Sequence, residues 1–305
     1  MPNNLEAQKS PPRTAPVKLD AMPVYYTPLM VAENDSFSPS AAKPRAAVDS
    51  WLKLSIKLDI PIQVIAPEPA SVEDIARAHL PAFVDAVLSC RVENGFHNRS
   101  EAVAKSLPYT SGAMLAAARE ALRNGRVAAA PCSGFHHAGY ANAGGFCTFN
   151  GLMVSAMALH ASGEATRVGI LDFDQHYGDG TDNIIDRLRI DWINHYSAGE
   201  HYGLPAEARR FLSSIPGLVA AMKDCDVILY QAGADPHIDD PLGGWLTTEQ
   251  LYERDLLVFQ AAAALGIPVA WNLAGGYQTP LRKVLRIHDG TMRACVGAHI
   301  IAQGI

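Results

Sequence analysis

The sequence has few cysteines, and their positions form no motif. Cys90, Cys132, Cys147, Cys225 and Cys295 are odd in number, scattered along the chain and include no CxxC pair. Such spacing is typical neither of a disulfide framework nor of a zinc site built from thiolates. We therefore expect a protein of a reducing compartment, with the cytoplasm as its location.

Long apolar runs and basic clusters are also missing. The longest apolar stretch, residues 258–271, contains Gln260, Gly266 and Pro268, and the first twenty residues hold no long apolar core. The sequence therefore predicts neither a membrane span nor a secretion signal. With a formal charge of -6 and no run of Lys and Arg, binding to nucleic acid through its phosphates is not expected. A mildly acidic chain suits a neutral or cationic small ligand.

The remaining composition is that of a folded enzyme-sized protein. With 305 residues, 49% of them hydrophobic and 18% charged, the chain has enough apolar material for one large core. Residues 1–20 are rich in Pro, Lys, Asn and Ser and are expected to form a flexible tail. No repeat or break in composition divides the remainder, so we expect a single catalytic domain over residues 21–305.

The first half of the chain predicts a mixture of strands and helices. Residues 71–89 begin with Ser71 and two early acids, which is typical of a capped helix, and Pro81 interrupts it. The other expected segments are a strand over 25–31, a helix over 36–58, an extended run over 61–67, a polar surface loop over 91–107 beside the binding site, and a helix over 111–125.

The second half repeats one pattern of a buried apolar run, a polar or glycine-rich turn and a helical stretch. The runs are RVAAAPC (126–132), RVGILDF (167–173), DVILYQAGA (226–234) and IPVAWNLAG (267–275). Near-continuous apolar strands that alternate with helices are typical of a parallel sheet covered on both faces. The fold class is therefore predicted as α/β, with helices on both sides of a mostly parallel central sheet.

Polar side chains follow each of these four runs. His136 and His137 come after the first, Asp172, Asp174, His176 and Asp179 after the second, Asp235, His237, Asp239 and Asp240 after the third, and Gly275, Gly276 and Tyr277 after the fourth. Ligand crevices of open α/β sheets form at the carboxyl ends of the strands. We therefore expect the four clusters to meet at one edge of the sheet.

The cluster after the second run has the pattern of a metal site. On a strand, Asp172, Asp174 and His176 point to the same side. Joined by Asp235, the pair Asp174 and His176 would hold a divalent ion and leave a coordination position open, as catalytic metals require. Zn²⁺ fits best, with Fe²⁺ and Mn²⁺ as alternatives. The plainer interpretation is that these are ordinary turn residues.

A metal that polarises a carbonyl needs partners that move protons. The adjacent His136 and His137 suit this role, and Asp172 and Asp179 are candidate acceptors for their second ring N–H groups. Tyr277, after two glycines, is a candidate donor to a developing oxyanion. The residues together predict a metal-dependent amide hydrolase.

Five ordered motifs carry a family resemblance. FHHA (135–138), GFCTFN (145–150), DFDQHYGDGT (172–181), GADPHIDDPLG (233–243) and GGY (275–277) resemble those of the histone deacetylase superfamily, which includes bacterial acetylpolyamine amidohydrolases. The resemblance implies the three-layer arginase/deacetylase fold and removal of an acyl group, with acetyl expected first. The substrate would be an acylated amine, either an acyl-lysine peptide or a polyamine.

The resemblance also implies roles for single residues. It implies one Zn²⁺ held by Asp174, His176 and Asp235, with a K⁺ site beside Asp172. It also implies that Asp172 orients His136 and that Asp179 orients His137. Tyr277 would polarise the carbonyl. Phe146 would form a wall of the acyl channel, and Gly145, Gly275 and Gly276 would line the substrate site. Association of the chain with further copies of itself stays open.

The chain departs from the family pattern at three points. Cys132–Phe135 replaces two prolines and a glycine, Tyr177 replaces a second histidine, and Ala274 replaces the first of three glycines. A binuclear manganese ureohydrolase is the alternative enzyme, but the carboxylate it needs four residues after Asp174 is Gly178. An inactive protein that binds acylated ligands is the third reading, although such a protein needs neither a proton relay nor an oxyanion donor.

Overall fold

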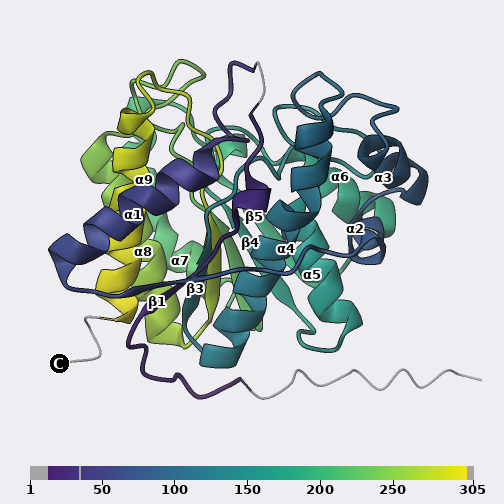
Figure 1. The fold of residues 1–305 in the computed structure, drawn as a ribbon. Helices are drawn as coiled ribbons and strands as arrows, with labels where there is room; N and C mark the ends of the chain where they lie inside the picture. The colour runs from purple at the N-terminus through teal and green to yellow at the C-terminus, as the bar shows by residue number, and fades with distance from the viewer. Residues whose placement is uncertain (1–12, 34–35, 301–305) are drawn as a thin grey trace, which may run out of the picture.

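A seven-stranded parallel sheet forms the centre of the computed structural model, which describes residues 13–33 and 36–300. The strand order is β2-β1-β3-β7-β6-β4-β5. The strands are β1 (Met22–Tyr25), β2 (Ile62–Ile65), β3 (Val127–Ala130), β4 (Val168–Asp172), β5 (Ile193–Ser197), β6 (Val227–Gln231) and β7 (Val269–Asn272). In Figure 1 their carboxyl ends point upward, toward the loops that carry the polar clusters.

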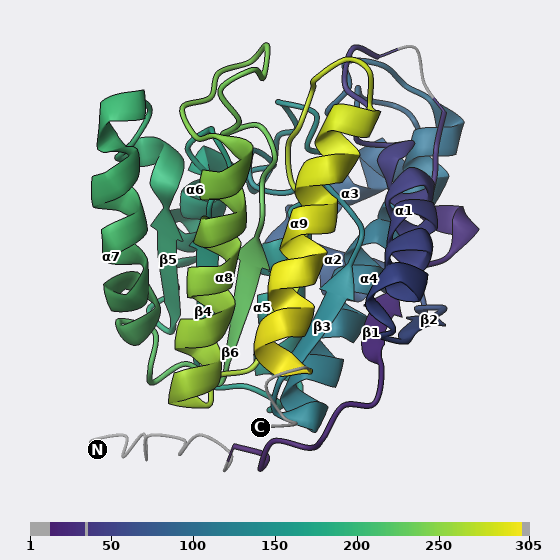
Figure 2. The same ribbon diagram turned by 90° about the vertical axis from the view of Figure 1, so that its left-hand side faces the viewer.

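Helices cover both faces of this sheet. Figure 2 shows α1 (Lys43–Leu58), α7 (Ala208–Ala220), α8 (Thr248–Leu265) and α9 (Arg282–His299) on the face toward the viewer. The other face carries α2 (Val72–Ala78), α3 (Pro81–Leu88), α4 (Glu101–Asn124), α5 (Gly151–Ala161) and α6 (Asp179–Leu188). Short 3₁₀ turns are η1 (Pro28–Met30), η2 (Ala198–Glu200) and η3 (Pro205–Glu207). The predicted three-layer α/β fold is confirmed.

Alternation along the strands explains why both faces are covered. In β6 the side chains of Ile228 and Tyr230 pack into the core under α7, α8 and α9, whereas Val227 and Leu229 pack into the core under α4 and α5. A strand with apolar residues on both faces is stable only when each face is covered. The larger core includes Trp51 of α1 against Trp271 of β7, with ring centroids 5.3 Å apart.

Three predicted segments differ from the structure. The helix predicted over 36–58 begins only at Lys43. The first strand is Met22–Tyr25, not 25–31, because Thr27 caps the 3₁₀ turn η1 and Pro28 begins it. The polar loop predicted over 91–107 ends at Ser100, whose side chain caps α4. Pro108 lies inside α4, and its carbonyl accepts a hydrogen bond from Ala70 N–H at 2.8 Å. That helix therefore runs through a proline usually read as a boundary.

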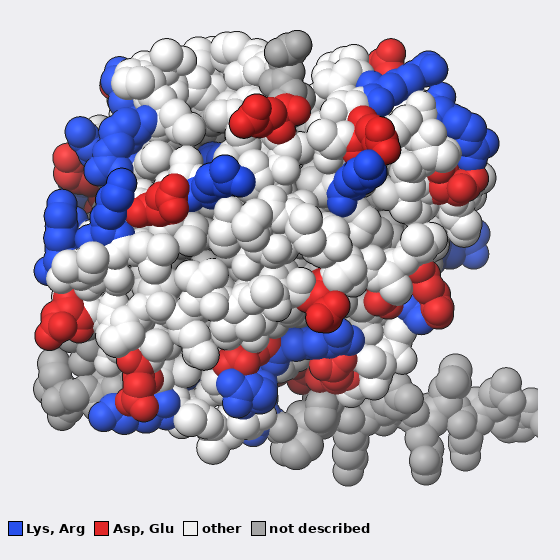
Figure 3. All heavy atoms as spheres, viewed as in Figure 1, with Lys and Arg blue, Asp and Glu red and all other residues white. Residues whose placement is uncertain are grey.

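The ends and the surface add three observations. Residues 1–12 of the predicted tail lie outside the described residues, while Val17 N–H donates to Asn124 O at 2.9 Å and so joins the following segment to α4. Within residues 13–33 and 36–300, none of the helices combines the length and apolar character that a bilayer crossing requires. On the face in Figure 3, acidic and basic side chains lie interspersed.

Candidate metal centre and active site

The four polar clusters meet at the carboxyl edge of the sheet, as the order of the strands requires. The neighbours β3, β7, β6 and β4 end in the loops that carry His136, Tyr277, Asp235 and Asp174 respectively. Because adjacent parallel strands lie about 5 Å apart, residues separated by more than a hundred positions come into contact. Gly275 N–H, for example, donates to Asp174 Oδ2 at 2.8 Å.

Asp174, His176 and Asp235 form the predicted group of ligands. One ligand atom from each lies within 4.8 Å of the other two. His176 Nδ1 is 3.2 Å from Asp174 Oδ1 and 3.2 Å from Asp235 Oδ2. Both carboxylates are buried, and the His176 side chain is one-third exposed. The group is therefore open on one side, where a substrate would enter.

The charges of this group fit a divalent cation. Asp235 Oδ2 is buried and, among the described residues, receives no well-aligned hydrogen bond. Burial and the facing Asp174 raise the pKa of Asp235 to about 7, whereas the hydrogen bond to Asp174 and the close Asp235 carboxylate raise the pKa of His176 to about 11. Two buried carboxylates that face each other are costly unless a cation lies between them. Two oxygens and one imidazole nitrogen are a donor set that zinc accepts.

His136 lies deepest in the site. Its Nδ1–H donates to Asp172 Oδ2 at 2.7 Å, and its Nε2 is 3.6 Å from Asp174 Oδ1. Asp172 is wholly buried, and its other oxygen accepts hydrogen bonds from Gln231 Nε2 and Asp174 N–H, both at 3.1 Å. Burial alone would lower the pKa of His136, but Asp172 and Asp174 raise it to about 9. The ring is therefore fixed in place and favours the charged form.

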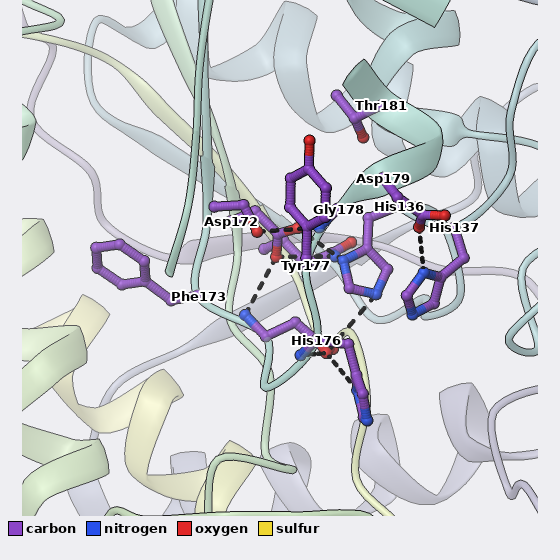
Figure 4. Close-up of polar contacts among 12 residues, drawn as sticks. His136, His137, Asp172, Phe173, His176, Tyr177, Gly178, Asp179 and Thr181 are labelled. Atoms are coloured by element: carbon purple, nitrogen blue, oxygen red, sulfur yellow. Dashed lines mark hydrogen bonds and ion pairs between the residues drawn. The ribbon is translucent and has the colours of Figure 1, made fainter. Parts of the chain in front are cut away.

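His137 stands between His136 and the opening. Its Nδ1–H donates to Asp179 Oδ1 at 2.6 Å, and its ring centroid is 4.1 Å from that of His136 (Figure 4). Asp179 begins α6, where the helix dipole favours a carboxylate. Burial and the neighbouring His136 lower the pKa of His137. A Cβ on Gly145 would lie 2.4 Å from His137 Cδ2, so only glycine fits against this ring.

Aromatic rings surround the opening. The ring centroid of Tyr277 lies 5.6 Å from that of Phe146 and 6.0 Å from that of Phe37. The ring centroids of Phe96 and Phe146 lie 6.0 Å apart. Tyr277 N–H donates to Asp240 Oδ2 at 2.8 Å, which fixes the loop that presents the ring. Burial and the carboxylates of the metal group raise the pKa of the Tyr277 hydroxyl, so it keeps its proton.

The glycines before Tyr277 allow close backbone approach to the carboxylates. A Cβ on Gly275 would lie 2.1 Å from Asp235 Oδ2 and 2.9 Å from Asp174 Oδ2. Gly276 has a φ of 145°, a conformation that L residues avoid. Gly275 therefore lies against the ligand group itself.

Lys43, at the start of α1, was not among the predicted site residues. It is fully buried, and its Nζ donates to Ala274 O at 2.6 Å, so it holds the turn that leads to Gly275. Burial lowers the pKa of Lys43 to about 8, although Asp235 and Asp174 oppose that shift. A cation in the first turn of a helix opposes the helix dipole. A lysine at this unfavourable position is the signal in the sequence that Lys43 has a role other than stabilising α1.

The departures from the family pattern have structural explanations. Phe135 is buried against α5, where a Cβ on Gly151 would meet its ring at 2.5 Å. In Figure 4 the Tyr177 ring points away from His176, and its hydroxyl donates to Asp182. His195 Nδ1–H donates to the other oxygen of that carboxylate at 2.7 Å. These changes leave the ligand group intact.

A small cavity reaches the ligand group from the aromatic opening. Its lining includes His136, Gly145, Asp174, Gly275 and Tyr277. A larger surface groove of about 610 Å³ lies between α1, α8 and α9, and none of the predicted site residues lines it. The predicted site residues therefore line the narrow cavity and not the larger groove.

Comparisons with known proteins show which proteins the chain resembles. The histone deacetylase domain model matches residues 40–197. An uncharacterized protein of Picosynechococcus is 29% identical over 63% of this chain and 69% of its own length, and acetylpolyamine amidohydrolase 1 of Pseudomonas aeruginosa is 28% identical over 55% and 56%. The chain thus spans about two thirds of the first relative and half of the second. The crystal structure of the HDA15 HD domain superposes with a TM-score of 0.74 at 21% identity, covering 90% of this chain and 91% of that one.

Proposed function

The chain belongs to the histone deacetylase family, and from this premise we propose that it is a zinc-dependent amidohydrolase that removes an acetyl group from an amine. The chain is a hydrolase that acts on amides. The metal, the roles of the side chains and the substrate are the proposed parts. The observation that carries them is the pair of buried carboxylates, Asp174 and Asp235, that share His176 and lie beside two histidines with carboxylate partners.

Asp174, His176 and Asp235 would hold the ion. When bound, Zn²⁺ supplies Lewis acidity that polarises the amide carbonyl and lowers the pKa of a water molecule. Fe²⁺ is the alternative that the donor set leaves open. K⁺ beside Asp172 stays a prediction.

The side chains divide the proton transfers between them. His137 is the better base because its lowered pKa keeps it neutral, and Asp179 occupies its Nδ1–H, which leaves Nε2 to accept the proton of the attacking water. The oxygen of that water adds to the carbonyl carbon, and the Tyr277 hydroxyl donates to the oxyanion that develops. The C–N bond then breaks as His137 returns the proton to the leaving amine. His136 is held in its charged form by Asp172, and it stabilises the negative charge that develops on the carbonyl oxygen.

The substrate is an acetylated amine that reaches the site through the aromatic opening. Phe146 and Tyr277 would pack against the aliphatic chain that joins the amide to the rest of the substrate. Acetyl-lysine and an acetylated polyamine both offer such a chain, and one relative is named for the second. The binuclear alternative is not favoured, because the described residues form one group of three ligands and Gly178 supplies no further carboxylate.

The test is a panel of acetyl-lysine peptides, acetylated polyamines and small amides assayed with the zinc-loaded protein. His137→Ala and Tyr277→Phe should each lower kcat/KM at least about a hundredfold. Elemental analysis should give one ion per chain. Turnover that survives both substitutions would refute the assigned roles, and two ions per chain would refute the mononuclear site.

A further inference from the structure

Among the described residues, no backbone–backbone hydrogen bond joins the loops that carry Asp174 and Asp235 beyond the sheet, and Gln175 N–H donates to Asp235 Oδ1 at 3.3 Å. Phe173 N–H donates to Gln231 O at 3.0 Å, which closes the β4–β6 ladder. Beyond the end of this ladder, Arg254 of α8 joins the two loops. Its Nη1 donates to Phe173 O at 3.0 Å and to Gly233 O at 2.7 Å. One carbonyl precedes Asp174 directly, and the other is two residues before Asp235.

A second set of contacts fixes the guanidinium. Arg254 Nε donates to Asp255 Oδ1 at 2.8 Å, and Tyr230 donates its hydroxyl to the same oxygen. The other oxygen of Asp255 accepts from Thr291 Oγ1 at 2.6 Å. All four side chains are fully buried. Donors from β6 and α9 therefore satisfy the Asp255 carboxylate, which holds the guanidinium in place by an ion pair of 2.8 Å.

We propose that Arg254 is a positioning residue that sets the separation of the Asp174 and Asp235 carboxylates and so the affinity of the site for its metal. The inference rests on the proposed metal-dependent function. One nitrogen of a planar guanidinium holds both loops at a fixed spacing while its other edge is tied to Asp255. Lysine keeps the charge, but its three donors all lie on one nitrogen at the end of a flexible stem, so it cannot replace both Nη1 between the carbonyls and Nε beside Asp255.

The experiment compares Arg254→Lys with Thr291→Val, a control that removes a donor from the same buried network without touching either ligand loop. Zinc affinity is measured by competition with a chromophoric chelator, folding by circular dichroism and stability by urea unfolding. We expect Arg254→Lys to weaken zinc binding about 10- to 100-fold, as the loss of supporting contacts does at metal sites. Thr291→Val should unfold at lower urea while its zinc affinity stays within about twofold of the unsubstituted protein.

Wild-type zinc affinity in a folded Arg254→Lys protein would overturn the proposal, and so would an equal loss of affinity in Thr291→Val. Should Arg254→Lys fail to fold, the pair Arg254→Gln with Asp255→Asn removes both charges together, so no lone charge is buried. The glutamine amide nitrogen lies two bonds nearer the backbone than Nη1 and so does not reach the position between the two carbonyls, and the same loss of affinity is expected. An unsubstituted protein that binds no zinc would instead refute the proposed function.

Discussion

Replacing Gly275 by alanine should greatly weaken metal binding while leaving the fold intact. The φ of Gly275 is not in the left-handed region, so alanine brings no backbone strain. Its Cβ, however, would lie 2.1 Å from Asp235 Oδ2, where real Cβ atoms keep at least 3.0 Å. The carboxylate must therefore move by about 0.9 Å, several times the tolerance of about 0.2 Å in metal–ligand distances.

A displacement of this size should cost at least about 100-fold in zinc affinity, the upper end of what changes around a ligand cause. The assay is a zinc competition titration of metal-free protein, with circular dichroism to verify the fold. Gly297→Ala in α9 is the matched control, because nothing lies within 4 Å of its added Cβ and alanine favours a helix. A folded Gly275→Ala protein with unchanged zinc affinity would show that Asp235 is not a ligand.

Three further predictions concern protonation and stability. His79 donates to Gly139 O and accepts from Asn150 N–H, both at 2.9 Å, and burial lowers its pKa to about 4. As pH falls, His79 is therefore protonated in the unfolded chain before it is protonated in the folded one, and on the order of 3 kcal/mol of stability should be lost between pH 6.5 and 4. The free energy of urea unfolding should depend less on pH in His79→Gln than in the unsubstituted protein. The same pH dependence in both proteins would contradict this. Asp179→Asn should lower the pKa of His137 further and shift the acidic limb of the pH profile of kcat/KM to lower pH. An acidic limb at the same pH would show that His137 is not the general base. Ser100→Ala should cost about 1 kcal/mol by uncapping α4, seen as a melting temperature about 2 °C lower.

The features predictable from sequence are those that local pattern determines. The four apolar runs appear as β3, β4, β6 and β7 because a strand buried on both faces has little freedom to be polar. The polar clusters follow these strands, so their meeting at one edge was predictable from the parallel arrangement alone. The family resemblance then assigned a partner to each histidine, and the structure has the same pairs in contact.

The features that sequence reasoning missed depend on contacts between distant segments. The edge strand β5 reads INHYS and is half-polar, so no apolar run marks it. Arg254 lies in a helix whose own pattern looks ordinary, and only the packing of α8 against the loops brings it to the site. The position of Lys43 in the first turn of α1 is unusual, but only the fold shows that its partner is Ala274 O. Pro108 hid the first two turns of α4, since a proline in a helix is usually a boundary.

The order of the strands also affects how the protein is made. β7 lies between β3 and β6 in the centre of the sheet, yet it is the last strand to leave the ribosome. Until residues 269–272 emerge, β3 and β6 have no partner on their inner edges, and these edges are apolar templates for pairing with other chains. The nascent chain therefore exposes both edges until β7 has been made. A truncation before β7 should aggregate, and it should not yield a smaller folded protein.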